Sequence, residues 1–401
     1  MAEHSAPSYD VAVVGGGLIG AAAALGLARQ GRRVLLLEPS QPLLQPGRLG
    51  LDIRTVAVSP ASRQLLESLG VWRTLQAAPY HRMEVWEERG TQAMVFDAVD
   101  VARAELGWIV ENGPAGAALW GALGGEENVT ICHDRVAELA TGDQQVELEL
   151  PQGRASARLL IAADGARSMV RERLGVAVET ADVGHVALAT AVRTAAPHQG
   201  VAYQRFLLDG PVALLPTRDP QICSVVWSQS PEAAARRSVL ADDAFCAELS
   251  AAVQGVLGAV LAVDQRVVFP LQQLLAASFN PHPRVLLIGD AARVLHPLAG
   301  LGANVGFEDV RDLLAVLARL PVAADPGSDR LWGGFDRQRL ARARLMLGLM
   351  SALRRAYARG DPLSQLLRNL GVGWLNGSSL LKRQVMQEAM GLGPMARGRA
   401  G

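Results

Sequence analysis

The chain has 401 residues, enough for two domains, and its 39 basic and 39 acidic residues give a formal net charge of zero. This balance argues against a protein that binds nucleic acid through phosphate contacts. The three cysteines, Cys132, Cys223 and Cys246, lack the spacing of metal ligands, so we expect free thiols and no metal. We expect a cytoplasmic protein, because the first residues do not resemble a signal peptide and no uncharged apolar run reaches the ~18 residues of a membrane span.

Residues 9–38 have the pattern of a strand, a glycine-rich turn, a helix and a second strand. In such a unit the turn lets a pyrophosphate approach the helix N-terminus, and an acid at the end of the second strand accepts hydrogen bonds from a ribose. The residues of this pattern are Gly15, Gly17 and Gly20 of the G-x-G-x-x-G turn, Leu18 and Ile19 between them, and the acid Glu38. The unit predicts dinucleotide binding and leaves open whether the ligand is FAD or NAD.

Two later strands also end in an acid. The apolar segment 158–163 is followed by Asp164, and the segment 284–288 is followed by Gly289 and Asp290. Ligands of parallel sheets bind at this edge, although each acid could instead cap a helix. A loop at 297–302 then leads into a helix expected over 303–320, whose positive N-terminal end would favour an anionic reduced flavin. These features together favour FAD.

The same segments match a known family. GGGLIG (15–20), DIRTVAVSPASRQLLESLGVW (52–72), VENGPAGAALW (110–120), AADGARSMVR (162–171) and GDAARVLHPLAGLGANVGFED (289–309) resemble the class A flavoprotein monooxygenases. Together with LLRNLG (366–371) and LKRQVMQEAMGL (381–392), they are most similar to the ubiquinone-biosynthesis hydroxylases. The middle of the chain most resembles the 2-polyprenylphenol hydroxylases of that branch.

The resemblance implies a role for each site residue. Glu38 would bind the adenosine ribose, Arg54 would reach the flavin side, Asp164 would lie near the adenine end, and Asp290 would hold the ribityl chain. The edge of the flavin ring would be lined through backbone groups of Pro297, Gly300, Leu301, Gly302, Ala303 and Asn304. The Pro297 carbonyl would sit beside the substrate hydroxyl, and the preceding His296 would orient the loop or pack against it.

Three positions depart from the family pattern. Arg293 stands where a histidine is usual, Leu301 replaces a glutamine or lysine, and Gly116 stands where a polar side chain commonly touches FAD. The resemblance therefore implies that side-chain contacts with FAD are fewer than in relatives, whereas backbone contacts are kept.

The expected fold is α/β, with a Rossmann-type FAD-binding domain, an inserted antiparallel-sheet substrate domain and C-terminal helices. We assign residues 1–80, 101–178 and 276–320 to the FAD domain. Residues 81–100 and 179–275 are assigned to the substrate domain, with a helix over 242–260, and 321–401 to a helical region.

The expected activity is hydroxylation of the aromatic ring of a polyprenylated phenol in ubiquinone biosynthesis, with NAD(P)H as transient reductant and O₂ as co-substrate. A lipophilic substrate suggests a peripheral contact with the inner membrane or with a biosynthetic complex. Three alternatives stay open: a hydroxylase of another aromatic metabolite, a flavin enzyme that saturates isoprenoid double bonds, and a non-catalytic FAD-binding scaffold.

Overall fold

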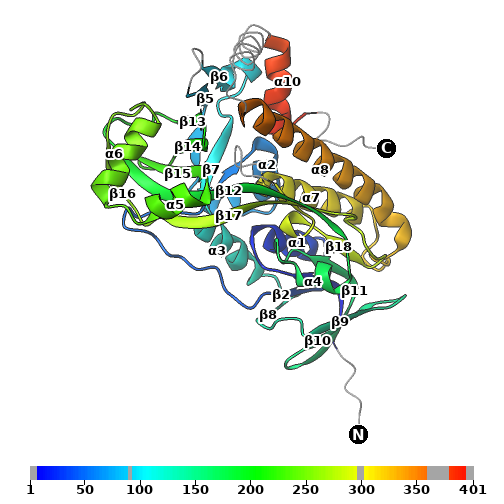
Figure 1. The fold of residues 1–401 in the computed structure, drawn as a ribbon. Helices are drawn as coiled ribbons and strands as arrows, with labels where there is room; N and C mark the ends of the chain where they lie inside the picture. Colours follow the sequence, from blue (N-terminus) through cyan, green and yellow to red (C-terminus); the bar gives the residue numbers. More distant parts are fainter. Residues whose placement is uncertain (1–6, 89–92, 296–301, 359–378, 394–401) are drawn as a thin grey trace.

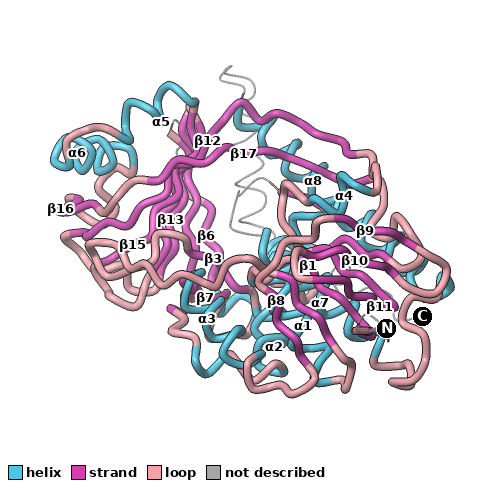
Figure 2. The backbone as a smooth tube through the Cα atoms, turned by 90° about the horizontal axis from the view of Figure 1, so that it is seen from below, coloured by secondary structure: helices cyan, strands magenta, loops and turns pink. Residues whose placement is uncertain are grey.

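The computed structural model describes residues 7–88, 93–295, 302–358 and 379–393. It contains two large sheets that lie side by side and are joined by the long strands β12 (Val178–Thr194) and β17 (Val267–Ala276) (Figures 1 and 2). Among the described residues, no helix combines the length and the apolar character that a membrane span requires.

The first sheet has seven strands and forms the Rossmann-type part of the fold. Its order is β8 (Val129–Cys132), β2 (Val34–Leu37), β1 (Ser8–Val14), β11 (Gly153–Ala162), β10 (Val146–Leu150) and β9 (Glu138–Thr141). The strand β18 (Val285–Leu287) pairs with the C-terminal end of β11, on the side where β10 pairs with its N-terminal half. The strands β8, β2, β1, β11 and β18 are mutually parallel, whereas β9 and β10 form an antiparallel hairpin. This parallel centre explains why the strands read as uninterrupted apolar runs.

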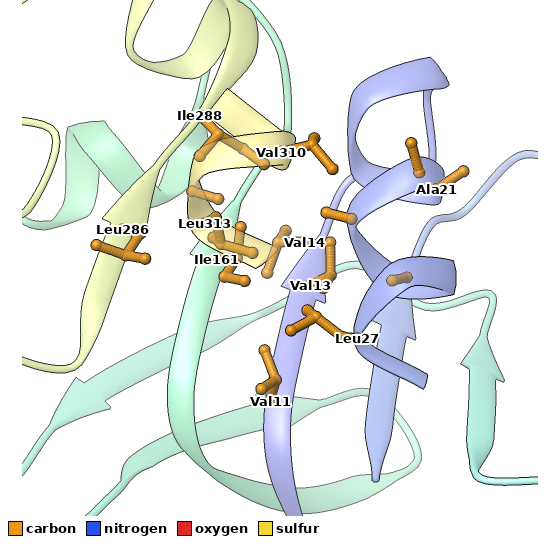
Figure 3. Close-up of a cluster of buried hydrophobic side chains, with 14 of the residues drawn as sticks. Val11, Val13, Val14, Ala21, Leu27, Ile161, Leu286, Ile288, Val310 and Leu313 are labelled. Carbon is orange, nitrogen blue, oxygen red and sulfur yellow. The ribbon is translucent and has the colours of Figure 1, made fainter. Parts of the chain in front are cut away.

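Helices α1 (Leu18–Arg29) and α7 (Gly302–Leu317) pack on this sheet and close the main core. Figure 3 shows Val11 and Val13 of β1 and Ile161 of β11 facing side chains of both helices. The run of small residues at 21–24 in α1 is fully buried, which lets α7 and α3 (Asn112–Leu123) approach closely. The alanines therefore serve close helix packing as well as helix propensity.

The second sheet has nine strands in the order β19, β17, β12, β15, β14, β13, β5 and β6, with β16 paired to β12. The bounds not yet given are β19 (Arg293–Val294), β15 (Ile222–Gln229), β14 (Gly210–Pro216), β13 (Val201–Leu207), β5 (Arg82–Glu87), β6 (Met94–Asp97) and β16 (Val260–Val263). The pairs are antiparallel except β13 with β5, which are parallel. The sheet is therefore mixed, and β5 and β6 join it from a distant part of the chain.

Two helices, α5 (Pro231–Ser238) and α6 (Asp242–Ala252), accompany the second sheet, and α6 covers one of its faces. Phe245 and Leu249 of α6 pack there against Leu188 and Trp227 in a second core. The helix predicted over 242–260 is wrong beyond Ala252, because Gln254 adopts a φ of 54° that ends the helix and the chain enters β16.

The remaining elements link these parts. A three-stranded sheet is formed by β3 (Thr55–Val58), β7 (Gly107–Glu111) and β4 (Ala78–Tyr80). The helices are α2 (Pro60–Ser68), α4 (Met169–Arg173), α8 (Asp329–Ala358) and α10 (Ser379–Ala389), and the 3-10 turns are η1 (Trp72–Thr74), η2 (Ala98–Val101) and η3 (Gly289–Ala291). Helix α8 runs across α7, and α10 packs on the segment 80–106 (Figure 1).

Candidate cofactor and substrate site

The carboxyl ends of four neighbouring parallel strands meet at one edge of the first sheet. Val14 of β1 pairs with Leu37 of β2 and with Ala162 of β11, and Ala162 pairs with Leu287 of β18. Glu38, Asp164 and Asp290 follow these strands within three residues. The structure therefore brings together the glycine turn and the three predicted acids along one groove edge, where parallel sheets bind ligands.

The glycine turn at the end of β1 fits a pyrophosphate. Gly15 has a φ of 101°, and a Cβ added there would lie 2.4 Å from the Ala163 carbonyl oxygen, so a side chain is excluded. A Cβ added at Gly17 would meet no atom within 4 Å, so the space beside the start of α1 is open. Backbone N–H groups at a helix N-terminus with open space in front of them form an anion site.

Glu38 lies beside this turn. Its carboxylate accepts hydrogen bonds from the Gly16 N–H at 2.7 Å and from the Ser40 N–H at 3.0 Å. The Trp120 indole of α3 donates to the Gly16 carbonyl at 2.8 Å. Trp120 thus fixes the turn from the other side, a contact that the sequence reading missed although the residue ends the matching segment 110–120.

Asp164 presents an oxygen for which no partner is found among the described residues. Its Oδ2 accepts the Val170 N–H of α4 at 3.2 Å, whereas its buried Oδ1 has no hydrogen-bond donor. The helix-cap role and a ligand role therefore coexist in one carboxylate. An unsatisfied buried acceptor at a ligand-binding edge fits a hydroxyl donor such as those of FAD.

Asp290 lies in η3 with its carboxylate open to solvent. Surrounding protein atoms nevertheless raise its pKa by desolvation; nearby Arg293 opposes the shift and Asp309 adds to it. A side chain that is both accessible and desolvated is recessed in a concave surface. The arrangement suits a carboxylate that accepts hydrogen bonds from the hydroxyls of a bound polyol chain.

A buried ionic network supports the η3 turn from below. Asp309 of α7 accepts the Gly289 N–H at 2.9 Å and forms ion pairs with Arg293 at 2.7 Å and with Arg339 of α8 at 2.6 Å. Burial lowers the pKa of Arg293, and Asp309 opposes that shift. The arginine that replaces the usual histidine thus neutralises Asp309 and is directed into the protein, away from the cofactor groove.

The start of α7 lies at the edge where the flavin ring is expected. Gly302 and Ala303 open the helix, one residue earlier than predicted. The Asn304 side chain turns to α2: its Oδ1 accepts from the Ser59 N–H and the Ser62 hydroxyl, both at 2.8 Å. The side chain of Asn304 therefore holds α2 against α7. Its backbone remains available for the predicted contact with the edge of the flavin ring. The predicted residues His296, Pro297, Gly300 and Leu301 lie outside the described residues.

Leu18 and Ile19, at the start of α1, are half-buried in packing positions. Ile19 lies against Gly289 and Gly306, so it joins the glycine turn to η3 and α7. Leu18 packs on the opposite side, next to Val58 and Leu119. Their side chains hold the cradle together, and their backbone remains available to a ligand.

Arg54 precedes β3 with a side chain that is 64% exposed. Asp52 positions this segment, because its carboxylate accepts the Arg54 N–H at 2.9 Å and the Gly113 N–H of α3 at 2.8 Å. Among the described residues, the Arg54 guanidinium has a single ionic contact, with Asp52 at 3.8 Å. Arg54 is therefore free to contact a ligand. Asp52 is a further residue that the sequence reading missed.

Gly116, the third departure, is explained by packing. A Cβ added there would lie 3.2 Å from the Cβ of Pro42, in the loop that follows β2.

Another residue with a structural role is Arg171, which is buried and donates to the carbonyls of Ala291 and Ala166 at 2.9 and 2.8 Å. It ties the Asp164 turn to η3 and is neither a solvated residue nor a phosphate ligand.

The face of the second sheet opposite α6 is mainly apolar, although Ser224 and Ser228 of β15 also lie on it. One row of directly paired residues crosses seven strands on this face: Met94, Val85, Gln204, Ala213, Val226, Ala189 and Val267. Phe206, on the same face of β13 as Gln204, packs against Leu295 and Met346. Because Leu295 directly precedes the segment 296–301, this face, called the wall below, is turned toward the cofactor edge.

The fold and the aligned strand ends define a flavin-dependent aromatic monooxygenase. The architecture is shared with p-nitrophenol 4-monooxygenase PnpA from Pseudomonas putida DLL-E4, with a TM-score of 0.76 and 21% identity over 97% of this chain and 99% of that one. Residues 8–348 match the family described as FAD binding domain. The enzyme is thus an FAD-dependent monooxygenase, for which NAD(P)H is the usual reductant.

More similar sequences give the particular family. The chain is 34% identical to 3-demethoxyubiquinol 3-hydroxylase of Escherichia coli (strain K12), with 96% of this chain and 98% of that protein covered. It is also 34% identical to ubiquinone hydroxylase UbiL of Rhodospirillum rubrum, with 96% and 91% covered. The chain belongs to the FAD-binding domain family and, within it, to the ubiquinone-biosynthesis hydroxylases, as the sequence resemblance predicted.

The residues present fit FAD. The open space at Gly17, the unpartnered oxygen of Asp164 and the recessed carboxylate of Asp290 all face one edge. Glu38 would hold the ribose, Asp164 the adenine end and Asp290 the ribityl chain. Among the residues that the structure describes, no three His, Cys, Asp or Glu side chains gather as metal ligands would.

Proposed function

We propose that the protein hydroxylates the aromatic ring of a polyprenylated phenol in ubiquinone biosynthesis, with a 2-polyprenylphenol as the favoured substrate. The observation that carries this proposal is the row across seven strands, which consists of six apolar residues and Gln204 and holds no charged side chain. An acidic aromatic substrate needs a cationic partner when it is buried, whereas a lipophilic phenol needs an apolar wall. The sequence relatives act on ubiquinone precursors, which supports the same substrate class here.

When bound, FAD would supply the oxygen chemistry of ring hydroxylation, with NAD(P)H as its reductant and O₂ as co-substrate. The chain's own residues bind, orient and exclude water. The glycine turn and the three acids hold the cofactor, and the Asp309 network fixes η3. The sheet face that carries Phe206 and Val226 shields the reacting ring from water, which limits wasteful loss of the activated oxygen.

The tail of such a substrate partitions into lipid. We therefore propose that the enzyme receives it at the surface of the inner membrane or from a biosynthetic complex. This proposal about substrate delivery rests on the lipophilic character of the substrate.

The decisive experiment combines purified enzyme and cells. NAD(P)H oxidation should depend on FAD, on O₂ and on a prenylated phenol, and the product should carry one added hydroxyl oxygen. Deletion of the gene should cause the corresponding unhydroxylated quinone precursor to accumulate. Oxidation that needs no oxygen would favour double-bond saturation, and FAD binding without any NAD(P)H oxidation would favour a scaffold. A protein that binds no FAD would exclude all of these functions. An unchanged quinone profile, combined with activity on a small polar phenol, would favour another aromatic metabolite.

A further inference from the structure

We infer that the Gln204 side-chain amide is the polar contact that binds the phenolic oxygen of the substrate and thereby orients its ring. This inference rests on the proposed function. Gln204 lies near the middle of β13, in the row that crosses the second sheet. It is the one polar residue of the seven that form that row.

The first argument is that Gln204 lacks a partner within the fold. The residue is 5% exposed, and no described residue forms a hydrogen bond with its amide. The amide atoms are not among the fully enclosed atoms without a partner in the described residues, in contrast to Nε2 of Gln229 in β15, so the amide of Gln204 keeps contact with solvent. A polar group that has no protein partner and stays accessible on an apolar surface is available to a ligand.

The second argument is its direction. Arg205, the next residue of β13, donates to the Ala252 carbonyl at the end of α6, at 2.6 Å. Successive side chains of a strand point to opposite faces, so Gln204 points away from α6. Phe206 shares that direction and packs against Leu295, beside the segment expected to line the flavin. The amide therefore lies on the wall turned toward the cofactor edge.

The third argument is the chemistry of its neighbours. The paired residues on either side, Val85 and Ala213, are apolar. A ring placed on this wall has one described amide in the row with which to form a hydrogen bond. The amide oxygen can accept a phenolic hydroxyl, and the amide nitrogen can donate to a ring oxygen. A single directional contact on an apolar surface selects how the ring is turned, and hence which carbon faces the flavin.

The test compares two ligands on FAD-loaded enzyme: ortho-geranylphenol and geranylbenzene, which lacks the hydroxyl. Dissociation constants are measured from the perturbation of the flavin absorption spectrum. Wild-type enzyme should bind the phenol about ten-fold more tightly than geranylbenzene, as one hydrogen bond to a buried amide allows. In Gln204→Met, which keeps the side-chain length, this preference should disappear while geranylbenzene binds as before. The matched control is Gln221→Met, an exposed glutamine before β15, which should retain the preference.

Thermal unfolding of the substrate-free enzyme gives an independent measure. Because the amide has no protein partner and is accessible to solvent, Gln204→Met should leave the midpoint within about 2 °C of the wild-type value. A larger fall in the midpoint would indicate a structural role, and such a fall or an unchanged ligand preference in the variant would overturn the inference. A wild-type enzyme that prefers the phenol but never hydroxylates it would instead overturn the proposed function and leave the role of Gln204 as a ligand contact intact.

Discussion

Arg293 and Asp309 form an ion pair of 2.7 Å in which the two side chains are 2% and 0% exposed. The same carboxylate accepts the Gly289 N–H, so the pair lies directly beneath the turn that presents Asp290. Arg339 of α8 neutralises the second oxygen at 2.6 Å. One carboxylate of α7 therefore joins the cofactor edge to α8.

Replacing that carboxylate should destabilise the protein strongly. Asp309→Asn leaves two buried guanidinium groups with a weaker partner, a situation that costs about 3–5 kcal/mol. The free energy of unfolding from urea titration measures this loss. Asp312→Asn provides a control, because Asp312 is half-buried and contacts Arg339 from the outside at 3.0 Å. Equal losses of unfolding free energy in the two variants would contradict the expectation that Asp309 contributes more to stability than Asp312.

Asp290 should make the stability of FAD-free protein depend on pH. Desolvation raises its pKa, so the folded state binds more protons than the unfolded state between the usual value of 3.8 and the raised value. Stability therefore falls as pH rises through this window, and Asp290→Asn should remove that fall. Urea titrations of the two FAD-free proteins from about pH 4 to pH 7 measure the difference. Parallel pH profiles would show that Asp290 is not desolvated.

The same variant should bind FAD about ten-fold more weakly, because a neutral acceptor forms weaker hydrogen bonds than a carboxylate. Fluorescence titration of FAD-free protein with FAD checks this expectation. If Asp290→Asn raises the free energy of unfolding and weakens FAD binding, Asp290 is a binding residue. If the substitution lowers both the free energy of unfolding and the affinity for FAD, Asp290 has a structural role.

Two glycines of the turn should respond differently to the same substitution. Gly15→Ala forces a side chain into a φ of 101° and against the Ala163 carbonyl, so the folded protein should lose several kcal/mol. Gly17 has φ −65° and ψ −176°, which alanine adopts readily, and the added methyl enters open space. Gly17→Ala should therefore fold with wild-type stability and fail to retain FAD. Melting curves and flavin absorbance separate these outcomes.

Arg54→Ala should leave folding intact. The side chain is mostly exposed, and its one ionic contact within the described part of the chain is the 3.8 Å contact with Asp52, so the change in unfolding free energy should stay within about 0.5 kcal/mol. Flavin retention, or the rate of its reduction by NAD(P)H, should fall if Arg54 reaches the flavin side. Wild-type flavin content and turnover in this variant would refute that placement.

Much of the fold could be predicted because local patterns determine it. The strand ends before Glu38, Asp164 and Asp290 follow from short apolar runs, and parallel pairing then brings them to one edge. The partners of Asp309 could not be predicted in this way. Arg293 and Arg339 lie 16 and 30 residues from it, and only the crossing of α8 over α7 brings them together.

The second sheet shows a similar limit. A strand at 201–208 is evident from its composition, but the face that Gln204 occupies depends on pairing with β14 and with the distant β5. The helix beyond Ala252 was predicted wrongly, since the apolar residues of β16 continue a helix-like pattern after a turn that Gln254 and Gly255 create. In both cases, the face of Gln204 and the end of α6, the structure depends on pairing between strands that are distant in the sequence.

The hydrogen bond from Trp120 to the Gly16 carbonyl gives this protein a built-in optical reporter. Tryptophan emission overlaps flavin absorption, so filling of the groove should dim ultraviolet emission. Substituting phenylalanine for this tryptophan should show how much of that dimming comes from the indole at the phosphate-binding turn. Loading and release of the yellow chromophore could then be followed in real time without any added dye.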